Sequence, residues 1–127
     1  MARILIIEDD PAQMKMTALM LINDGHTVLR AVDAESGMAL ARSERPDLIV
    51  MDVKLPGMDG LSATVRLKQT PATAAIPIIA LTGLARQHDE KNALAAGCSA
   101  YIAKPLRYQE LYATIDTILG KGNPGSP

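Results

Sequence analysis

The sequence LIVMDVKLPGMDG, residues 48–60, joins four apolar residues to a lone aspartate, Asp52, and then to a loop rich in proline and glycine. A short apolar run bounded by Pro46 and Pro56 is typical of a strand buried in a parallel sheet. Asp52 then stands at the carboxyl end of this strand, at the edge where open parallel sheets bind ligands. A carboxylate directly after a fully apolar stretch needs a compensating partner or a chemical role. We therefore expect Asp52 to be the central residue of a functional site.

The rest of the chain alternates strand patterns with helical patterns. Strands are predicted at residues 3–7, 27–31, 48–52, 76–81 and 99–103, and helices at 11–24, 34–43, 61–69, 86–96 and around 111–119. Five strands alternating with five helices predict an α/β fold built on a doubly wound parallel sheet. One domain is expected over residues 1–120, followed by a flexible tail at residues 121–127.

The predicted helices also indicate which residues form the core. Asp10 is the expected N-cap of the first helix and Pro11 its first residue, because the carboxylate accepts backbone N–H groups and proline has none to leave unpaired. The core stripe expected on this helix consists of Met14, Ala18, Leu21 and Ile22. Met16 and Met20 fall on the other side of the helix. The helix at 61–69 is expected to turn Leu61, Val65 and Leu67 inward.

Composition limits the function classes. The chain has 127 residues, of which 48% are hydrophobic, so it can bury one sizeable core. Its 13 basic and 14 acidic residues are scattered, which gives no footprint for nucleic acid or a membrane surface and favours protein partners. The single Cys98 cannot form an internal disulfide, and the apolar run at residues 4–7 is too short for a signal peptide. A cytoplasmic protein is expected.

Polar residues follow four of the predicted strands and should converge on one edge of the sheet. These residues are Glu8, Asp9, Asp52, Thr82 and Lys104. Three carboxylates in one cleft repel one another unless a cation joins them, and Lys104 is the one basic residue among these five. An all-oxygen ligand set with few protein groups suits Mg²⁺, and the absence of histidine from these strand ends argues against zinc.

Such a site suits phosphoryl transfer, in which Asp52 is the nucleophile and Mg²⁺ and Lys104 neutralise charge while the Thr82 hydroxyl binds a phosphoryl oxygen. Each residue taken alone has a simpler interpretation. Lys104 is also compatible with a solvated loop lysine and Thr82 with a strand-end cap. Glu8 and Asp9 are also compatible with acids that stabilise a helix N-terminus. Their joint occurrence at one sheet edge favours the phosphoryl-transfer site.

Four segments together resemble the receiver domains of response regulators in two-component signalling. These segments are ILIIEDD (4–10), MDVKLPGMDG (51–60), IIALTG (78–83) and AYIAKP (100–105). They stand in the family's order and spacing, and the resemblance covers about residues 2–120. It implies a flavodoxin-like sheet with strand order 2-1-3-4-5. The opening segment and the absence of an output domain also resemble single-domain regulators of the DivK type.

The resemblance implies a role for each matching residue. Asp52 is the phosphoacceptor, and Glu8, Asp9 and the Lys54 backbone carbonyl join it around Mg²⁺. Thr82 and Tyr101 match the family's switch pair. Lys104 matches its phosphoryl-binding lysine, followed by a cis bond to Pro105. Two departures are Glu8, where the family more often has Asp, and Gly83, where it more often has Ala or Ser.

The function implied is a phosphorylatable switch or relay that catalyses only its own phosphorylation and dephosphorylation. Its expected partners are a histidine kinase or histidine-phosphotransfer protein and a downstream protein target, and the chain is expected to be a monomer or weak dimer. A phosphohydrolase that forms an aspartyl phosphate is the alternative, but it needs a second carboxylate two residues after the nucleophile, where this chain has Lys54. A pseudo-receiver that only binds is a third reading. We expect the phosphodonor to dock on Gln13, Met16 and Met20 of the first helix.

Overall fold

The computed structural model describes residues 2–83 and 87–120, and the side chains of these residues except at 87–89. Its centre is a five-stranded parallel sheet in the order β2-β1-β3-β4-β5. The strands are β1 (Arg3–Ile7), β2 (Thr27–Ala31), β3 (Leu48–Asp52), β4 (Ile78–Thr82) and β5 (Ala100–Ala103). The helices are α1 (Pro11–Asn23), α2 (Ala34–Glu44), α3 (Gly60–Gln69), α4 (Gln87–Ala96) and α5 (Tyr108–Leu119). The predicted fold class and strand order are confirmed.

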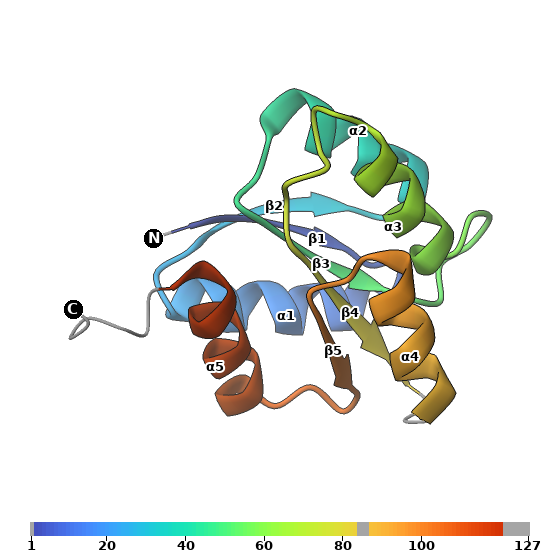
Figure 1. Ribbon diagram of the computed structural model, residues 1–127. Helices are drawn as coiled ribbons and strands as arrows, with labels where there is room; N and C mark the ends of the chain where they lie inside the picture. The colour runs from blue at the N-terminus through green and yellow to red at the C-terminus, as the bar shows by residue number, and fades with distance from the viewer. Residues whose placement is uncertain (1, 84–86, 121–127) are drawn as a thin grey trace.

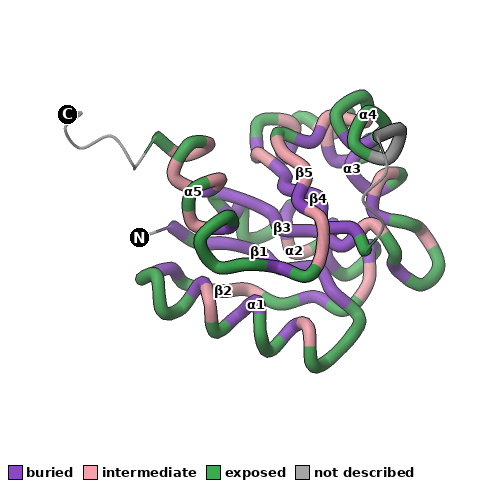
Figure 2. Tube along the Cα trace, turned by 90° about the horizontal axis from the view of Figure 1, so that it is seen from below, coloured by how far each residue is buried: buried purple, intermediate pink, exposed green. Residues whose placement is uncertain are grey.

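Helices cover both faces of the sheet (Figure 1). The helices α2, α3 and α4 pack on one face, over a core that includes Leu5, Ile49 and Ile78. The helices α1 and α5 pack on the other face, over a second core that includes Ile6 and Val50. Successive residues of a strand therefore point their side chains into opposite cores, because side chains alternate between the two faces of a sheet. Every residue of β3 is buried because both faces of the strand are covered, as the tube in Figure 2 shows.

Three helices begin with an aspartate cap that fixes where the chain turns after a strand or loop. Asp10, Asp33 and Asp59 each accept a hydrogen bond from the backbone N–H three residues further on, at 3.1, 2.8 and 2.8 Å. Pro11 is the first residue of α1, as predicted. The caps of α1 and α3 fix where these helices begin, after β1 and after the loop that follows β3. Of the acidic residues near the sheet edge, Asp10 and Asp59 cap helices, and others form the candidate site described below.

The structure corrects part of the predicted core. Ile22 and Val65 were expected inside, but their side chains are 47% and 39% exposed. On α1 the buried residues are Met14, Thr17, Ala18 and Leu21. At about 100° per residue this set is centred between Ala18 and Thr17, and Ile22 lies roughly 90° away from that centre. Thr17 moves the buried stripe because a hydroxyl residue packs there in place of an apolar one.

The remaining differences concern the ends of elements and residues outside the description. β4 begins at Ile78 rather than at residue 76, although Ile76 itself is buried in the core. The predicted start of a helix at Arg86 and the predicted tail at 121–127 fall outside the described residues. Among the helices that are described, none has the length and apolar character needed to span a membrane.

Candidate functional site

Three carboxylates meet at the carboxyl edge of the sheet. Asp52 is the last residue of β3, and Glu8 and Asp9 follow β1, its neighbour in the sheet. Oxygen atoms of these three side chains lie within 4.8 Å of one another. Glu8 and Asp52 are 3% and 6% exposed, whereas Asp9 is exposed to solvent. The structure therefore brings together the acid cluster that the strand-end pattern predicts.

Lys104 supplies a positive charge to this cluster. Its ammonium group donates to Asp52 Oδ2 at 3.2 Å and to Glu8 Oε1 at 3.5 Å. The Lys104 backbone N–H donates to the carbonyl oxygen of Thr82 at 2.7 Å, which ties the residue after β5 to the end of β4. The Lys104–Pro105 peptide bond is cis, as the family resemblance implies. One lysine thus faces two buried carboxylates.

Burial raises the pKa of the Glu8 carboxyl above its ordinary value, and the charge of Asp52 acts in the same direction. Two groups oppose these effects. The backbone N–H of Asp10 donates to Glu8 Oε2 at 3.0 Å, and Lys104 attracts the ionised form. The pKa of Glu8 is therefore raised, and an added cation at the cluster would favour its ionised form.

The loop after Asp52 folds back on the strand end. The Lys54 N–H donates to Asp52 Oδ1 at 3.2 Å. The Gly60 N–H donates to the Val53 carbonyl oxygen at 2.8 Å and closes the loop where α3 begins. Thr64, buried on the first turns of α3, donates its hydroxyl to the Gly60 carbonyl oxygen at 2.8 Å. The sequence pattern marks Gly60 only as a loop residue and gives no signal for Thr64.

Thr82 and Tyr101 occupy neighbouring strands on the same side of the site. Thr82 ends β4, one residue beyond Leu81, which pairs with Asp52, and its side chain is buried. Tyr101 lies on β5, pairs with Ala80 and packs partly buried against the core under α2, α3 and α4. Their placement fits the switch pair that the resemblance implies, and their roles stay a prediction.

The donor set fits a divalent cation with oxygen ligands. Three carboxylates offer oxygen atoms to one point, and the nearby ammonium group balances only part of their charge when all three are ionised. Mg²⁺ prefers a few carboxylate oxygens and completes its octahedron with other oxygen ligands. The described residues add no histidine or cysteine to this cluster, so the set has the chemistry of Mg²⁺ rather than of zinc.

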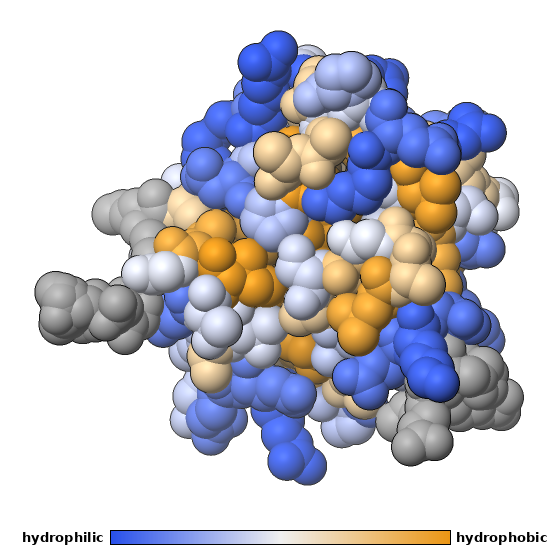
Figure 3. Space-filling model, in the orientation of Figure 1, coloured by the Kyte–Doolittle hydropathy of each residue, from blue (hydrophilic) through white to orange (hydrophobic). Residues whose placement is uncertain are grey.

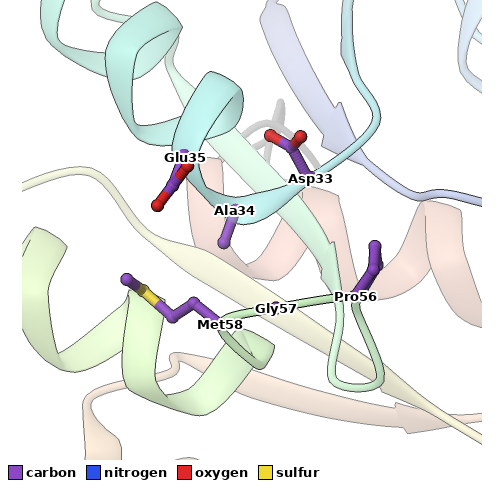
Figure 4. Close-up of a pocket in the computed structure, with 6 residues that line it drawn as sticks. All are labelled: Asp33, Ala34, Glu35, Pro56, Gly57 and Met58. Carbon is purple, nitrogen blue, oxygen red and sulfur yellow. The ribbon is translucent and has the colours of Figure 1, made fainter.

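A separate cleft of about 280 Å³ borders the same loop from the side of α2 (Figure 4). It is lined by Asp33, Ala34, Glu35, Pro56, Gly57 and Met58. The Ser36 hydroxyl and N–H bind the Asp33 carboxylate and lower its pKa. Because that carboxylate already caps α2, the cleft lacks the convergent buried charges of the acid cluster. The acid cluster is therefore the candidate site.

The residues predicted to dock a phosphodonor do not form one exposed stripe. Met16 is 41% exposed, but Gln13 and Met20 are partly buried. Met20 packs against the core under α1 and α5, and its carbonyl oxygen accepts a hydrogen bond from Tyr112 of α5 at 2.7 Å. The predicted position of Met20 away from the core is wrong because α5 covers that side of α1. The large apolar residues that α1 exposes are instead Met16, Leu19 and Ile22.

Comparison with known proteins identifies the class. A family model described as the response regulator receiver domain matches residues 4–116. The chain belongs to this family, whose members are signalling switches of two-component systems. Its sheet order and its acid cluster are those that the sequence resemblance implied.

Relatives of similar length match most of the chain. The protein PilH of Pseudomonas aeruginosa is 40% identical over 119 residues, which cover 94% of this chain and 98% of that protein. The polar-differentiation response regulator DivK of Brucella anthropi is 37% identical and is covered to 95% of its length, with 92% of this chain aligned. A putative response regulator of Chloroflexus aurantiacus has a crystal structure that matches with a TM-score of 0.90 at 33% identity, over 94% of this chain and 98% of that one.

One solved structure bears on the metal. The receiver domain of a sensor histidine kinase of Pseudomonas aeruginosa, 36% identical with a TM-score of 0.87, covers 94% of this chain and 98% of its own. That structure contains a magnesium ion coordinated in its active site cleft. A magnesium site is therefore known in a receiver domain similar to this chain.

Proposed function

We propose that this protein takes a phosphoryl group from a phosphohistidine donor onto Asp52 and works as a switch or relay. The observation that carries the proposal is the buried Asp52 carboxylate, 3.2 Å from the Lys104 ammonium group and clustered with two further acids. An Asp52 oxygen forms a bond to phosphorus while the bond from phosphorus to the donor imidazole nitrogen breaks. The electron pair of that bond stays on the imidazole nitrogen, which takes up a proton.

The neighbouring residues are proposed to support this transfer. Glu8, Asp9, Asp52 and the Lys54 backbone carbonyl would hold Mg²⁺, which supplies charge neutralisation for the phosphoryl oxygens. The Lys104 ammonium group would leave Glu8 and bind a phosphoryl oxygen. The buried Thr82 hydroxyl lies at the end of the neighbouring strand, within the same edge of the sheet, and would bind another.

Phosphorylation would then change the shape of the face formed by α4, β5 and α5. A phosphoryl group adds about −1.5 to −2 charge, which draws the Thr82 hydroxyl toward Asp52 and leaves space for Tyr101. This face carries exposed apolar side chains, including Leu94 and Tyr108, which are 48% and 52% exposed. In Figure 3 hydrophobic side chains form small patches separated by hydrophilic ones. Such a surface suits a downstream protein target that binds one state of the switch.

The phosphodonor is proposed to be a histidine kinase or a histidine-phosphotransfer protein in the cytoplasm, meeting this chain as a monomer or weak dimer. Its histidine must reach Asp52, so it must lie over the strand ends and the adjacent α1. Met16 and Leu19, 41% and 50% exposed, offer apolar contacts on that helix. Figure 2 views the molecule from the side of α1, where exposed positions recur along the helix.

The phosphoacceptor is tested with a small phosphodonor and intact-mass measurement. Wild type and Asp59→Asn should gain one phosphoryl mass in Mg²⁺ and none in a chelator. Asp59 is the matched control because it is an exposed helix cap on the same loop, and Asn caps a helix as well as Asp does. Asp52→Asn should stay unmodified, and a phosphoryl mass on Asp52→Asn would refute the assignment. Sustained release of many phosphates per chain would favour the hydrolase instead.

The docking surface is tested by comparing two donors. Met16→Glu and Leu19→Glu should slow transfer from a phosphorylated histidine-phosphotransfer protein and leave the reaction with a small phosphodonor unchanged. Val65→Glu is the control, since Val65 is a similarly exposed apolar residue on α3. Equal slowing with both donors, or no slowing with the protein donor, would contradict docking on this face.

A further inference from the structure

Gly60, the first residue of α3, lies directly against the backbone that carries Asp52. A Cβ atom at position 60 would overlap the Asp52 carbonyl oxygen and would lie 2.9 Å from Val53 Cα and 3.1 Å from the Asp52 carbonyl carbon. All of these are backbone atoms, which cannot rotate away as the end of a flexible side chain does. The helix can therefore approach the end of β3 this closely only when residue 60 has no side chain.

The same contact closes the loop that borders the acid cluster. The Gly60 N–H bonds to the Val53 carbonyl oxygen at 2.8 Å, and the buried Thr64 hydroxyl bonds to the Gly60 carbonyl oxygen at 2.8 Å. Inside the closed loop the Lys54 N–H holds Asp52 Oδ1 at 3.2 Å. The place where α3 rests on the strand thus sets the position of Lys54 relative to the Asp52 carboxylate.

We propose that Gly60 is a positioning residue of the phosphoacceptor site. Its missing side chain lets α3 rest on the end of β3, and this contact holds the Asp52 carboxylate and the Lys54 backbone in the arrangement that binds Mg²⁺. The inference rests on the proposed function, because it concerns the metal ligands of that same site. A side chain at position 60 forces either the Asp52–Val53 backbone or the start of α3 to move, and the metal ligands move with them.

Gly37 on α2 offers a matched control for the loss of stability. A Cβ atom there would overlap the Ile7 side chain and would lie 2.7 Å from its Cγ1, so the alanine variant also meets a steric conflict. That conflict is with the movable side chain of Ile7 and not with the backbone that carries Asp52 and Val53. Gly37→Ala and Gly60→Ala therefore separate a general packing defect from a displaced metal site.

The experiment measures the Mg²⁺ dissociation constant by calorimetry for wild type, Gly60→Ala and Gly37→Ala, together with urea unfolding in a chelator. Groups that orient metal ligands typically change metal affinity by about 10- to 100-fold, so Gly60→Ala should bind Mg²⁺ at least about tenfold more weakly. Gly37→Ala should lose stability and keep the wild-type dissociation constant. The proposal is overturned by wild-type affinity in Gly60→Ala, or by equal losses of affinity in both variants.

A measurement on wild type keeps the proposal testable if Gly60→Ala does not fold. Mg²⁺ should slow amide hydrogen exchange at Gly60 and Lys54, the two amides that hold the loop, and leave the amide of Ser36 in the α2 cap unchanged. Unchanged exchange at Gly60 and Lys54 would overturn the proposal.

The outcomes also separate this inference from the proposed function. A wild type that binds Mg²⁺ but gains no phosphoryl mass defeats the proposed function alone, whereas phosphorylation with a Gly60→Ala affinity like wild type defeats this inference alone.

Discussion

Replacing Glu8 by glutamine should stabilise the protein when no metal is bound. Burial raises the pKa of Glu8 above its ordinary 4.5. A raised pKa in the folded state means that the stabilising contribution of this carboxyl is complete below pH 4.5 and is lost as the pH rises through the folded-state pKa. Above that pKa the wild type keeps a costly charge in the cluster, whereas Glu8→Gln keeps a neutral amide of the same shape.

Desolvation of the buried carboxylate is the largest cause of the raised pKa of Glu8, and the charges around it act in both directions. Lys104 Nζ lies 3.5 Å away, which attracts the ionised carboxylate by about 5 kcal/mol at an effective dielectric constant of about 20. Asp9 and Asp52 lie within 4.8 Å and each repel it by at least about 3.5 kcal/mol on the same basis. Solvent screens the exposed Asp9, so the repulsions and the attraction nearly cancel, and the desolvation of the buried carboxylate decides the sign. We expect Glu8→Gln to raise the free energy of unfolding by about 1–2 kcal/mol at pH 8.

Urea unfolding at pH 8 and pH 5, with a chelator and with Mg²⁺, checks this expectation. The stabilisation should shrink toward pH 5, where protonation of Glu8 begins to relieve the wild type. Mg²⁺ should reverse the order, because it gains more from the ionised Glu8 than from an amide. Glu35→Gln, an exposed carboxyl on α2, should change stability by less than about 0.5 kcal/mol at either pH. A Glu8→Gln protein less stable than wild type at pH 8 without metal would refute the reasoning.

Three further substitutions test other contacts by urea unfolding. Lys104→Met should cost about 3 kcal/mol at pH 8 without metal, because two buried carboxylates lose their cation, and an unchanged midpoint would contradict that pairing. Tyr112→Phe should cost about 1 kcal/mol through the lost hydrogen bond to the Met20 carbonyl oxygen, whereas a neutral result would show that water replaces the hydroxyl. Asp59→Ala should cost about 1 kcal/mol through loss of the α3 cap, and Asp59→Asn should restore most of it.

The sequence predicts the fold and the acid cluster because both depend on local patterns and on topology. An apolar run that ends in Asp52 places the carboxylate at a strand end, and parallel strands bring their carboxyl ends to one edge. Glu8 and Lys104 then meet there although 96 residues separate them in the chain. No knowledge of side-chain packing was needed for that step.

The errors lie where a neighbouring element decides burial. Helical periodicity gives the angle between Leu21 and Ile22 but not the centre of the buried face, which Thr17 shifts. Met20 is partly buried because α5 packs beside it, a contact between segments about ninety residues apart. Gly60 was missed as a positioning residue for the same reason, since its role depends on how closely α3 approaches β3.

Lys104 links the charge of the site to the strand that carries Tyr101. Its ammonium group is shared by Glu8 and Asp52, and its backbone N–H is bonded to Thr82, so three strand ends meet through one residue. A phosphoryl group on Asp52 would compete with Glu8 for that ammonium group, because its oxygens carry more negative charge than a carboxylate. Movement of the lysine toward phosphorus would then act on the end of β5 through its own backbone. The electrostatic cost of holding three acids around one cation would thereby drive a change at β5 when Asp52 is phosphorylated.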